Sequence, residues 1–411
     1  WSNLYDVYSD FKAKLQAEEL GYEGMLYRDI IERNSIPNRY DTYVFVGFNV
    51  LQAVEQKLFS ALKKEGKARF YWDYDHYYLK ATNEAGVYID KWFDKFPNEF
   101  DAENELYNCF EQEKEVRYIS APTENLQARY ISEWLLENNR YQAGKRTAVV
   151  MCNEALLQTV IHCIPTEVDL LNVTTGYPLS QTPITSMVWQ LIALQTEGYS
   201  AQEGAYRLQH LSHVLRHPYG KYLNIDAAKL LAELKTEKQY YIKVERTRLQ
   251  HINTPVTALV AWLSDMVRTI ATNGAESDDQ LFQESTFRMY TLLNKLLELM
   301  KDGDLIADFV IFRRLFSQLI ASTSIPFHGE PARGVQIMGV LETRNLDFDN
   351  VLLLSCNEGN MPKGVSDVSF IPHFVRKAYG LTTIDNKVSV FSYYFHRLLQ
   401  RAKNVTLLYN N

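Results

Sequence analysis

Short, nearly all-apolar runs recur along this chain of 411 residues, and helical patterns separate them. The runs are rich in Val, Ile, Leu and aromatic residues, which is typical of strands buried on both faces of a parallel sheet. The predicted strands are residues 43–48, 68–74, 116–121, 147–152, 335–341, 351–356 and 405–409. Because strands alternate with helices, the sequence indicates an α/β fold.

A helical pattern leads into the last predicted strand. Its apolar residues recur at spacings of three and four, which places them on one face of a helix. They are Val388, Phe391, Phe395, Leu398 and Ala402. We therefore expect a helix that packs on the sheet immediately before the last strand.

The middle of the chain, from about residue 195 to residue 325, lacks this alternation. It shows long helical periodicity, for example over residues 287–300, and contains little Gly or Pro. We expect an all-helical insertion here. Because the strand pattern resumes at residue 335, the insertion would divide one α/β domain into two sequence segments.

Composition limits the class of protein. Apolar residues make up 46% and charged residues 23%, and no apolar run approaches the roughly 18 residues that span a bilayer. The four cysteines contain no C-x-x-C pair, so we expect neither a disulfide framework nor a zinc site of that kind. These features predict a cytoplasmic protein with no membrane contact. Because the chain begins at Trp1 without a signal segment and ends in a predicted strand, we expect it to be a piece of a longer protein.

The formal net charge of −7 argues, as an average, against a nucleic-acid partner. The acidity is local, however, because residues 71–115 hold 12 acidic residues against 4 lysines, a balance of −8, which leaves +1 for the rest. Residues 331–411 hold 9 Lys and Arg against 6 Asp and Glu, and residues 207–221 are basic with no acid. The average therefore does not exclude nucleic-acid binding by these two segments.

Two kinds of catalytic motif are absent. No Gly-Lys pair has the upstream Gly and the following Ser or Thr of a G-x-x-x-x-G-K-[ST] loop, so this chain cannot cradle a triphosphate by that route. The three E-x-K matches fall in helical or turn contexts and not on a strand, where a metal-dependent nuclease commonly needs them. We therefore predict no catalytic residue and no metal site.

Three histidines recur at i, i+3 and i+7, so they would share one face of a helix. They are His210, His213 and His217. Imidazoles at this spacing can bind zinc, but no fourth ligand lies nearby in the sequence. We interpret the segment as an exposed basic face that contacts DNA or a partner, with the neighbouring cations Arg207, Arg216 and Lys221.

Residues 335–362 (VQIMGVLETRNLDFDNVLLLSCNEGNMP) closely resemble motif V of UvrD-like superfamily-one helicases. In that family a strand is followed by T-x-H-x-x-K-G-L-E-F, a second strand and an E-G-x-x-P turn. Here Arg344 stands in the place of the lysine, Asn345 of the glycine and Leu346-Asp347-Phe348 of L-E-F, and Asn357-Glu358-Gly359 with Pro362 match the turn.

Residues 391–410 are similar to motif VI of the same family, a helix that ends T-R-A before a strand. Gln400-Arg401-Ala402 occupies the T-R-A place. In the family the motif VI arginine reaches the γ-phosphate of the nucleotide, a role that suits a fixed and always-charged group. The resemblance implies that Arg401 corresponds to it.

Three N-terminal segments resemble further motifs of the family. Residues 44–49 resemble the motif II strand, with Gly47 and Phe48 in the places of the Asp-Glu pair that binds Mg²⁺ and activates water. Residues 70–78 resemble motif III, G-D-x-x-Q, with Trp72 for Gly, Asp73 retained and His76 for Gln. Residues 147–153 resemble the motif IV strand, with Met151 about where its arginine falls.

The resemblance implies two RecA-like (P-loop NTPase-like) parallel-sheet domains. The first would be residues 1–125, a remnant, and the second residues 126–195 and 326–411, interrupted by a helical insertion of the 2B type at residues 196–325. The relic nucleotide site would consist of Asp73, His76, Asp347 and Arg401. Thr343 and Arg344, in the loop after a strand, are candidates for contact with DNA phosphates.

Without the paired carboxylates of motif II, this site has nothing to hold Mg²⁺ or orient the attacking water, so ATP hydrolysis should be lost. The pattern resembles the degenerate helicase half of AddB-like subunits, or of the related proteins that join a helicase to a PD-(D/E)XK nuclease, more than it resembles a working motor. The resemblance implies a part in double-strand end processing for recombinational DNA repair. It also implies DNA as a partner, as single strands or duplex ends, and an AddA-like helicase–nuclease subunit. ATP and Mg²⁺ would be bound only elsewhere in the parent protein or by that subunit.

Two other functions fit the same residues. One is an active superfamily-one DNA helicase with unusual motifs, which predicts DNA-stimulated ATP hydrolysis by the full-length parent protein. The other is a protein-interaction module that has lost both ligands and retains the helical insertion and the acidic segment as docking surfaces.

Overall fold

The computed structural model describes residues 3–33, 39–80, 83–237, 239–252, 255–301, 308–326, 333–363 and 370–411. The described residues form two compact units. The first unit takes its residues from 1–174 and 329–411, and the second from 175–328. Because nearly all predicted strands belong to the first unit and the long helical periodicity belongs to the second, each unit is built from one kind of sequence pattern.

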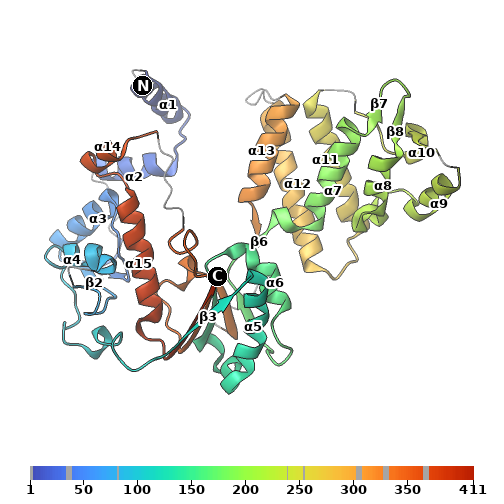
Figure 1. Cartoon of the computed structure of the whole chain (residues 1–411). Coiled ribbons are helices and arrows are strands. Elements are labelled where there is room, and N and C mark those ends of the chain that lie inside the picture. The colour runs from blue at the N-terminus through green and yellow to red at the C-terminus, as the bar shows by residue number, and fades with distance from the viewer. Residues whose placement is uncertain are drawn as a thin grey trace. The chain divides into compact units, whose positions relative to one another are not determined.

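A six-stranded, wholly parallel sheet forms the centre of the first unit (Figure 1). Its strands, in spatial order, are β3 (Glu115–Ala121), β13 (Asn404–Asn410), β12 (Asn350–Leu354), β4 (Thr147–Met151), β11 (Val335–Gly339) and β5 (Leu171–Val173). Every residue of β4, β11 and β12 is buried, as their mostly apolar sequences predict. The predicted α/β class is confirmed.

Helices cover both faces of this sheet. On one face, α5 (Glu124–Leu136) and α6 (Leu157–His162) bury Ile131, Trp134 and Val160 in a cluster with strand residues. On the other face, α15 (Ile384–Gln400) buries Leu398 against strand residues, and this is the helix that the apolar stripe before the last strand predicts. The result is a three-layer α/β/α arrangement.

A second, two-stranded parallel sheet lies in the same unit, formed by β1 (Tyr43–Val46) and β2 (Ala68–Tyr71). It packs with α3 (Ala53–Lys64) and α4 (Val87–Phe93) around an aromatic core that includes Phe59, Phe70 and Phe96. Tyr393 of α15 is fully buried in this core. One helix, α15, therefore packs against both sheets, and Figure 1 shows it running beside the α3 and α4 region.

Shorter elements complete the first unit. They are α1 (Leu4–Ala17), α2 (Glu23–Glu32), α14 (His373–Ala378) and the 3₁₀ helices η1 (Glu84–Gly86), η2 (Glu105–Tyr107), η3 (Glu137–Arg146), η4 (Glu154–Leu156) and η7 (Leu341–Thr343). Two of them, η2 and η7, flank the candidate site that is described below.

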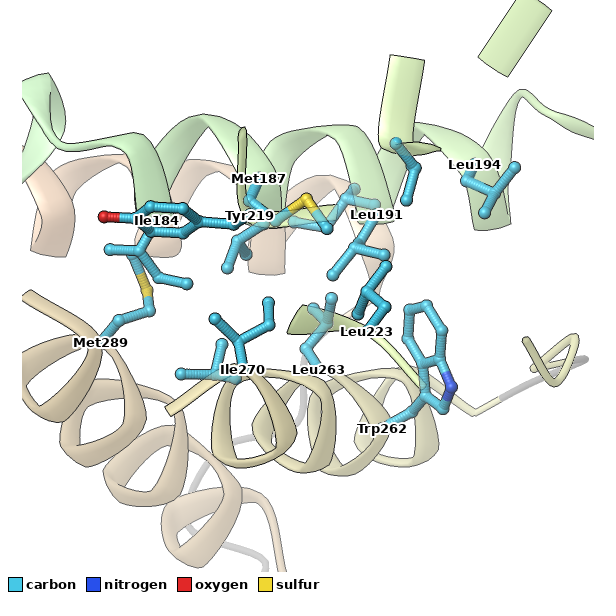
Figure 2. Packing of buried hydrophobic residues seen from close by; sticks show 14 of the residues in the cluster. Ile184, Met187, Leu191, Leu194, Tyr219, Leu223, Trp262, Leu263, Ile270 and Met289 are labelled. Carbon is cyan, nitrogen blue, oxygen red and sulfur yellow. The ribbon is translucent and has the colours of Figure 1, made fainter. Parts of the chain in front are cut away.

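The second unit is mainly helical. Its helices are α7 (Pro183–Thr196), α8 (Leu208–Arg216), α9 (Ala227–Glu237), α10 (Val244–Thr247), α11 (Val256–Asn273), α12 (Gln280–Lys301), α13 (Phe309–Ser322), η5 (Leu179–Gln181) and η6 (Pro218–Tyr222). Figure 2 shows its core, where Met187 and Leu191 of α7 lie in one apolar cluster with Leu263 of α11 and Met289 of α12. The predicted helical run at residues 287–300 lies within α12.

The prediction that this segment is all-helical is wrong. A three-stranded antiparallel sheet forms from β7 (Tyr199–Ser200), β8 (Ala205–Arg207) and β9 (Tyr241–Lys243). A further antiparallel pair joins β6 (Tyr177–Pro178) to β10 (Ser324–Ile325). Strands of two or three residues are too short to show a period of two, so periodicity could not find them.

The unit boundaries also differ from the predicted ranges. The second unit begins at residue 175, so it includes α7, whereas the predicted insertion began at residue 196. Strand β3 pairs with β13 in the six-stranded sheet, although it falls within the range 1–125 that we assigned to the first domain. An apolar run predicts burial but does not specify which element buries it.

None of the helices in the described ranges is both long enough and apolar enough to cross a bilayer.

Candidate functional site

The C-terminal half of α15 positions the candidate site. Tyr393, Arg397 and Arg401 recur every four residues, so they lie on one face of the helix and its C-cap. This face meets the segment that follows β2, where the Tyr393 hydroxyl donates to the Asp73 carbonyl oxygen at 2.9 Å. Two turns later, Gln400 Nε2 donates to the Tyr74 carbonyl oxygen at 2.8 Å. These hydrogen bonds from uncharged side chains to backbone carbonyls fix the helix against the segment after β2, which we call the post-β2 segment.

Two arginines and two aspartates form an ion-pair cluster at this junction. Arg397 Nη1 lies 2.8 Å from Asp347 Oδ1, and Arg397 Nε also donates to the Asp73 carboxylate. Arg401 Nη2 lies 2.9 Å from Asp73 Oδ1, and its Nη1 lies 3.1 Å from Asp347 Oδ1. Each carboxylate therefore contacts both guanidinium groups, and the charges of the four side chains sum to zero.

The cluster is largely shielded from water. The Arg397 side chain is 4% exposed, those of Arg401 and Asp73 are 17% and 18% exposed, and that of Asp347 is 36% exposed. Burial alone would raise the pKa of Asp347, but Arg397 and Arg401 outweigh it and hold that pKa below its usual range. Burial likewise opposes the charge of Arg397, but the two carboxylates raise its pKa above the ordinary value. Both groups are therefore ionised at neutral pH.

A cavity of about 270 Å³ borders the cluster. It lies within the first unit, and segments far apart in the sequence meet around it: the ends of β1 and β2, the loop after η7, and the end of α15. Its polar and glycine lining comprises Gly47, Asp73, Asn345, Asp347, Arg397 and Arg401. Five of these six residues stand at positions that the sequence resemblance assigns to motifs II, III, V and VI.

The position of Gly47 is shaped for a residue without a side chain. Its φ of +68° lies in the left-handed region, and a Cβ atom built on it would come 2.5 Å from side-chain atoms of Asn345. The next residue, Phe48, packs edge-to-face on Phe59 with 5.3 Å between ring centroids. Neither residue has a side-chain oxygen that could bind a metal ion. Within the described ranges, no group of three or more His, Cys, Asp or Glu side chains is placed to hold a metal ion.

The arrangement therefore favours a structural ion-pair cluster over a ligand-binding site. A phosphate group would have to replace carboxylates that already accept hydrogen bonds from Arg397 and Arg401. Charge-assisted pairs of this kind are short and strong, and breaking a buried one costs several kcal/mol. The cluster can join the post-β2 segment, the loop after η7 and α15 as one neutral, hydrogen-bonded unit.

The other sequence-predicted residues of this unit lie outside the cluster. His76 does not line the cavity, and its Nε2 lies 2.9 Å from the Ala102 carbonyl oxygen. Thr343 is 2% exposed, and its hydroxyl donates to the Val340 carbonyl oxygen at 2.7 Å, so it is not accessible to a DNA phosphate. Arg344 is exposed and makes no ion pair with a described residue. The structure thus brings together Asp73, Asp347 and Arg401 but not His76.

Sequence reasoning missed Arg397, the most buried member of the cluster. It occurs one helical turn before Arg401, on the same face of α15. Since residues four apart are neighbours on a helix, its spacing from the predicted motif VI arginine was the available signal.

Comparison with known proteins does not place the chain in a family: no protein-family model matches it, and no curated protein is significantly similar to it. What the structure establishes is an α/β fold with a six-stranded parallel sheet. The motif assignments depend on the order of the motifs along the chain and on the convergence of their residues.

The basic residues of the second unit lie around α8. Arg207 and Arg216 line a groove of about 920 Å³. Lys221 lies outside that lining, with its Nζ 4.8 Å from the centroid of the Tyr222 ring. All three side chains belong to exposed residues, as the sequence predicts for a basic face.

One of the three predicted histidines has a structural role. His217 Nε2 lies 2.8 Å from the Ser186 hydroxyl, and His217 Nδ1 accepts a hydrogen bond from the Tyr219 amide at 3.1 Å. Burial lowers the pKa of His217, which favours the neutral ring at neutral pH. His217 therefore caps η6 and does not contribute to the basic face. The other two histidines, His210 and His213, lie on α8 with 6.4 Å between their ring centroids.

Proposed function

We propose that this chain is a DNA-engaging scaffold segment of an AddB-like helicase–nuclease that does not hydrolyse ATP, and that it acts in double-strand end processing for recombinational DNA repair. One observation carries the proposal: residues at positions matched to motifs II, III, V and VI line a single cavity although they are up to 354 positions apart, from Gly47 to Arg401. This convergence supports the match between these sequence segments and the motifs.

In this proposal the two sheets of the first unit correspond to a RecA-like pair. The β1–β2 sheet with its aromatic core would be the remnant of the first domain, and the six-stranded sheet would be the second. Helix α15 contacts both, as a motif VI helix must in order to carry an arginine to a nucleotide bound at the junction.

Loss of hydrolysis is supported by the chemistry at the cavity. Gly47 and Phe48 leave no carboxylate for Mg²⁺ or for the attacking water, and Arg401 is paired with Asp73 and Asp347. The motif VI arginine would thus have changed from a group that binds phosphate to one that joins structural segments. ATP and Mg²⁺ would be supplied elsewhere in the parent protein or by an AddA-like subunit.

DNA engagement is supported by the position of the cations. Arg344 is exposed in the loop after η7, and Arg207 and Arg216 line a groove with no carboxylate in its lining. Exposed, unpaired cations are what phosphate contacts require.

ATP hydrolysis tests the first half of the proposal. The full-length parent protein, with Mg²⁺ and saturating single-stranded DNA, should hydrolyse ATP at the same rate as its Arg401→Ala variant, because Arg401 acts on no nucleotide. A DNA-stimulated rate that falls by about 10³-fold or more in Arg401→Ala, the scale of an arginine finger, would overturn the proposal in favour of an active helicase.

DNA binding tests the second half. Fluorescence anisotropy with single-stranded and forked DNA should show binding that weakens steeply between about 50 and 200 mM salt. If no binding is detectable at the lower salt concentration, the scaffold does not engage DNA, and the chain acts as a protein-interaction module.

A further inference from the structure

A groove beside α8 combines cations with exposed aromatic rings. It has a volume of about 920 Å³ and lies wholly within the second unit. Its lining includes Arg207, Ser212, Arg216, Lys235, Tyr240 and Tyr241 and contains no Asp or Glu. We call it the Tyr240 groove.

The two faces of α9 explain why acidic residues stay out of the groove. Leu231, Leu234 and Lys235 line it. Glu233 and Glu237, one turn apart, instead pair with Arg246 at 3.6 and 2.7 Å. Glu233 and Glu237, the acidic residues nearest in sequence to Lys235, are therefore held by Arg246, and neither lines the groove.

The cations that line the groove keep their charge available. Arg216 and Lys235 make no ion pair with a described residue, and Arg216 is exposed at the last turn of α8. Arg207 donates through Nη1 to the carbonyl oxygen of Glu197, which orients the guanidinium without neutralising it. The lining thus carries three positive charges with no compensating carboxylate.

The tyrosines are held in place by their backbones while their rings face water. Tyr240 is 79% exposed, yet its carbonyl oxygen accepts from the Leu208 amide at 2.8 Å. Tyr241 is 44% exposed and lies in β9 directly opposite Arg207 of β8. Exposed rings on a fixed backbone, next to cations, are the arrangement on which unpaired bases stack.

We infer that the Tyr240 groove binds a short run of single-stranded DNA, with backbone phosphates on Arg207, Arg216 and Lys235 and bases stacked on Tyr240 and Tyr241. The inference rests on the proposed function in that it takes DNA as the partner. Stacking requires unpaired bases, so the rings favour a single strand over a duplex. An acidic peptide would satisfy the cations but gains little from two neighbouring tyrosine rings.

Anisotropy titrations of the full chain with a labelled oligo-dT strand and with a duplex of equal length test this site. Tyr240→Ala should weaken single-strand binding by about 5- to 150-fold, the range for loss of one stacked base, and leave duplex binding unchanged. In Arg216→Gln/Lys235→Gln, the slope of log affinity against log salt should fall by about 1.4, because about 0.7 is lost per phosphate contact to a single strand.

Two variants of the same unit serve as matched controls. Phe287→Ala removes an aromatic ring that is 61% exposed on α12, and Arg268→Gln removes an exposed cation from α11. Both should bind single strands like the unmodified chain, and circular dichroism should show that all variants are folded.

Three results would overturn the inference, and they separate it from the proposed function. If the unmodified chain binds DNA but the groove variants bind as tightly as the controls, the groove is not the site, and the proposed function stands. If polyglutamate displaces the strand and Tyr240→Ala has no effect, the groove is a site for acidic peptides. If the unmodified chain binds no DNA at low salt, both the inference and the proposed function fail.

Discussion

At the scale of single residues, Asp73, Asp347, Arg397 and Arg401 form a structural contact in which opposite charges balance one another. Each charge is balanced by neighbours within 3.1 Å, and no magnesium or phosphate is needed to balance them. The resemblance to helicase motifs predicted Asp73, Asp347 and Arg401 as members of one site, because their residue types and spacings fit those motifs. It could not select Arg397, whose importance arises only from two carboxylates that are 324 and 50 positions away.

Replacing the most buried of these residues should destabilise the first unit. Arg397→Met removes a guanidinium that is 4% exposed and leaves two carboxylates to share Arg401. We expect the free energy of unfolding, measured by urea titration, to fall by about 3–5 kcal/mol. Lys403→Met removes the exposed partner of Asp349 and should cost less than about 1 kcal/mol. Equal losses in the two variants would contradict a structural role for the cluster.

At the scale of elements, helix ends depend on side chains that periodicity does not identify. The segment containing His210, His213 and His217 reads as one continuous helical face, but α8 ends at Arg216 and His217 caps the following η6. Pro218 marks this boundary in the sequence. The contact of His217 with Ser186, on α7, becomes visible only when the helices are packed.

The cap at His217 should make the second unit sensitive to acid. Burial lowers the pKa of His217 in the folded protein below that in the unfolded chain, so the folded state binds fewer protons. Its contribution to stability is present above the unfolded value of about 6.5 and is lost as the pH falls through the folded pKa. Thermal midpoints measured between about pH 7.5 and pH 5 should fall less in His217→Asn, whose Oδ1 can accept from the Tyr219 amide without titrating. His213→Asn, at an exposed position, should follow the unmodified chain, and a His217→Asn curve with the original slope would contradict the prediction.

At the scale of the whole molecule, the chain divides into two units that each bury a separate core. In the second unit, Met187, Leu263 and Met289 come from three helices of that unit alone. The sequence indicated this division through a change from strand–helix alternation to helical periodicity. It did not indicate that α7 belongs with the helices that follow it, because α7 is apolar nearly all round and would suit either core.

The second unit should therefore fold by itself. A fragment covering residues 175–326 should show helical circular dichroism and a single cooperative thermal transition. Leu263→Ala, at a fully buried position, should reduce the stability of the fragment by about 2–5 kcal/mol. A fragment that melts without cooperativity would show that its core depends on the rest of the chain.

The sequence alone determined the α/β class, the positions of the long strands and the helical character of the middle segment. These properties are local, because the spacing of apolar residues within a segment predicts whether it forms a strand or a helix and which face it buries. Only the tertiary structure decided that β3 pairs with β13, that α7 joins the helical core, and that Arg397 and Arg401 are neutralised by Asp73 and Asp347. These strand pairs and ion pairs join residues that are from 50 to more than 300 positions apart, and a local pattern carries no information about which distant partner is chosen.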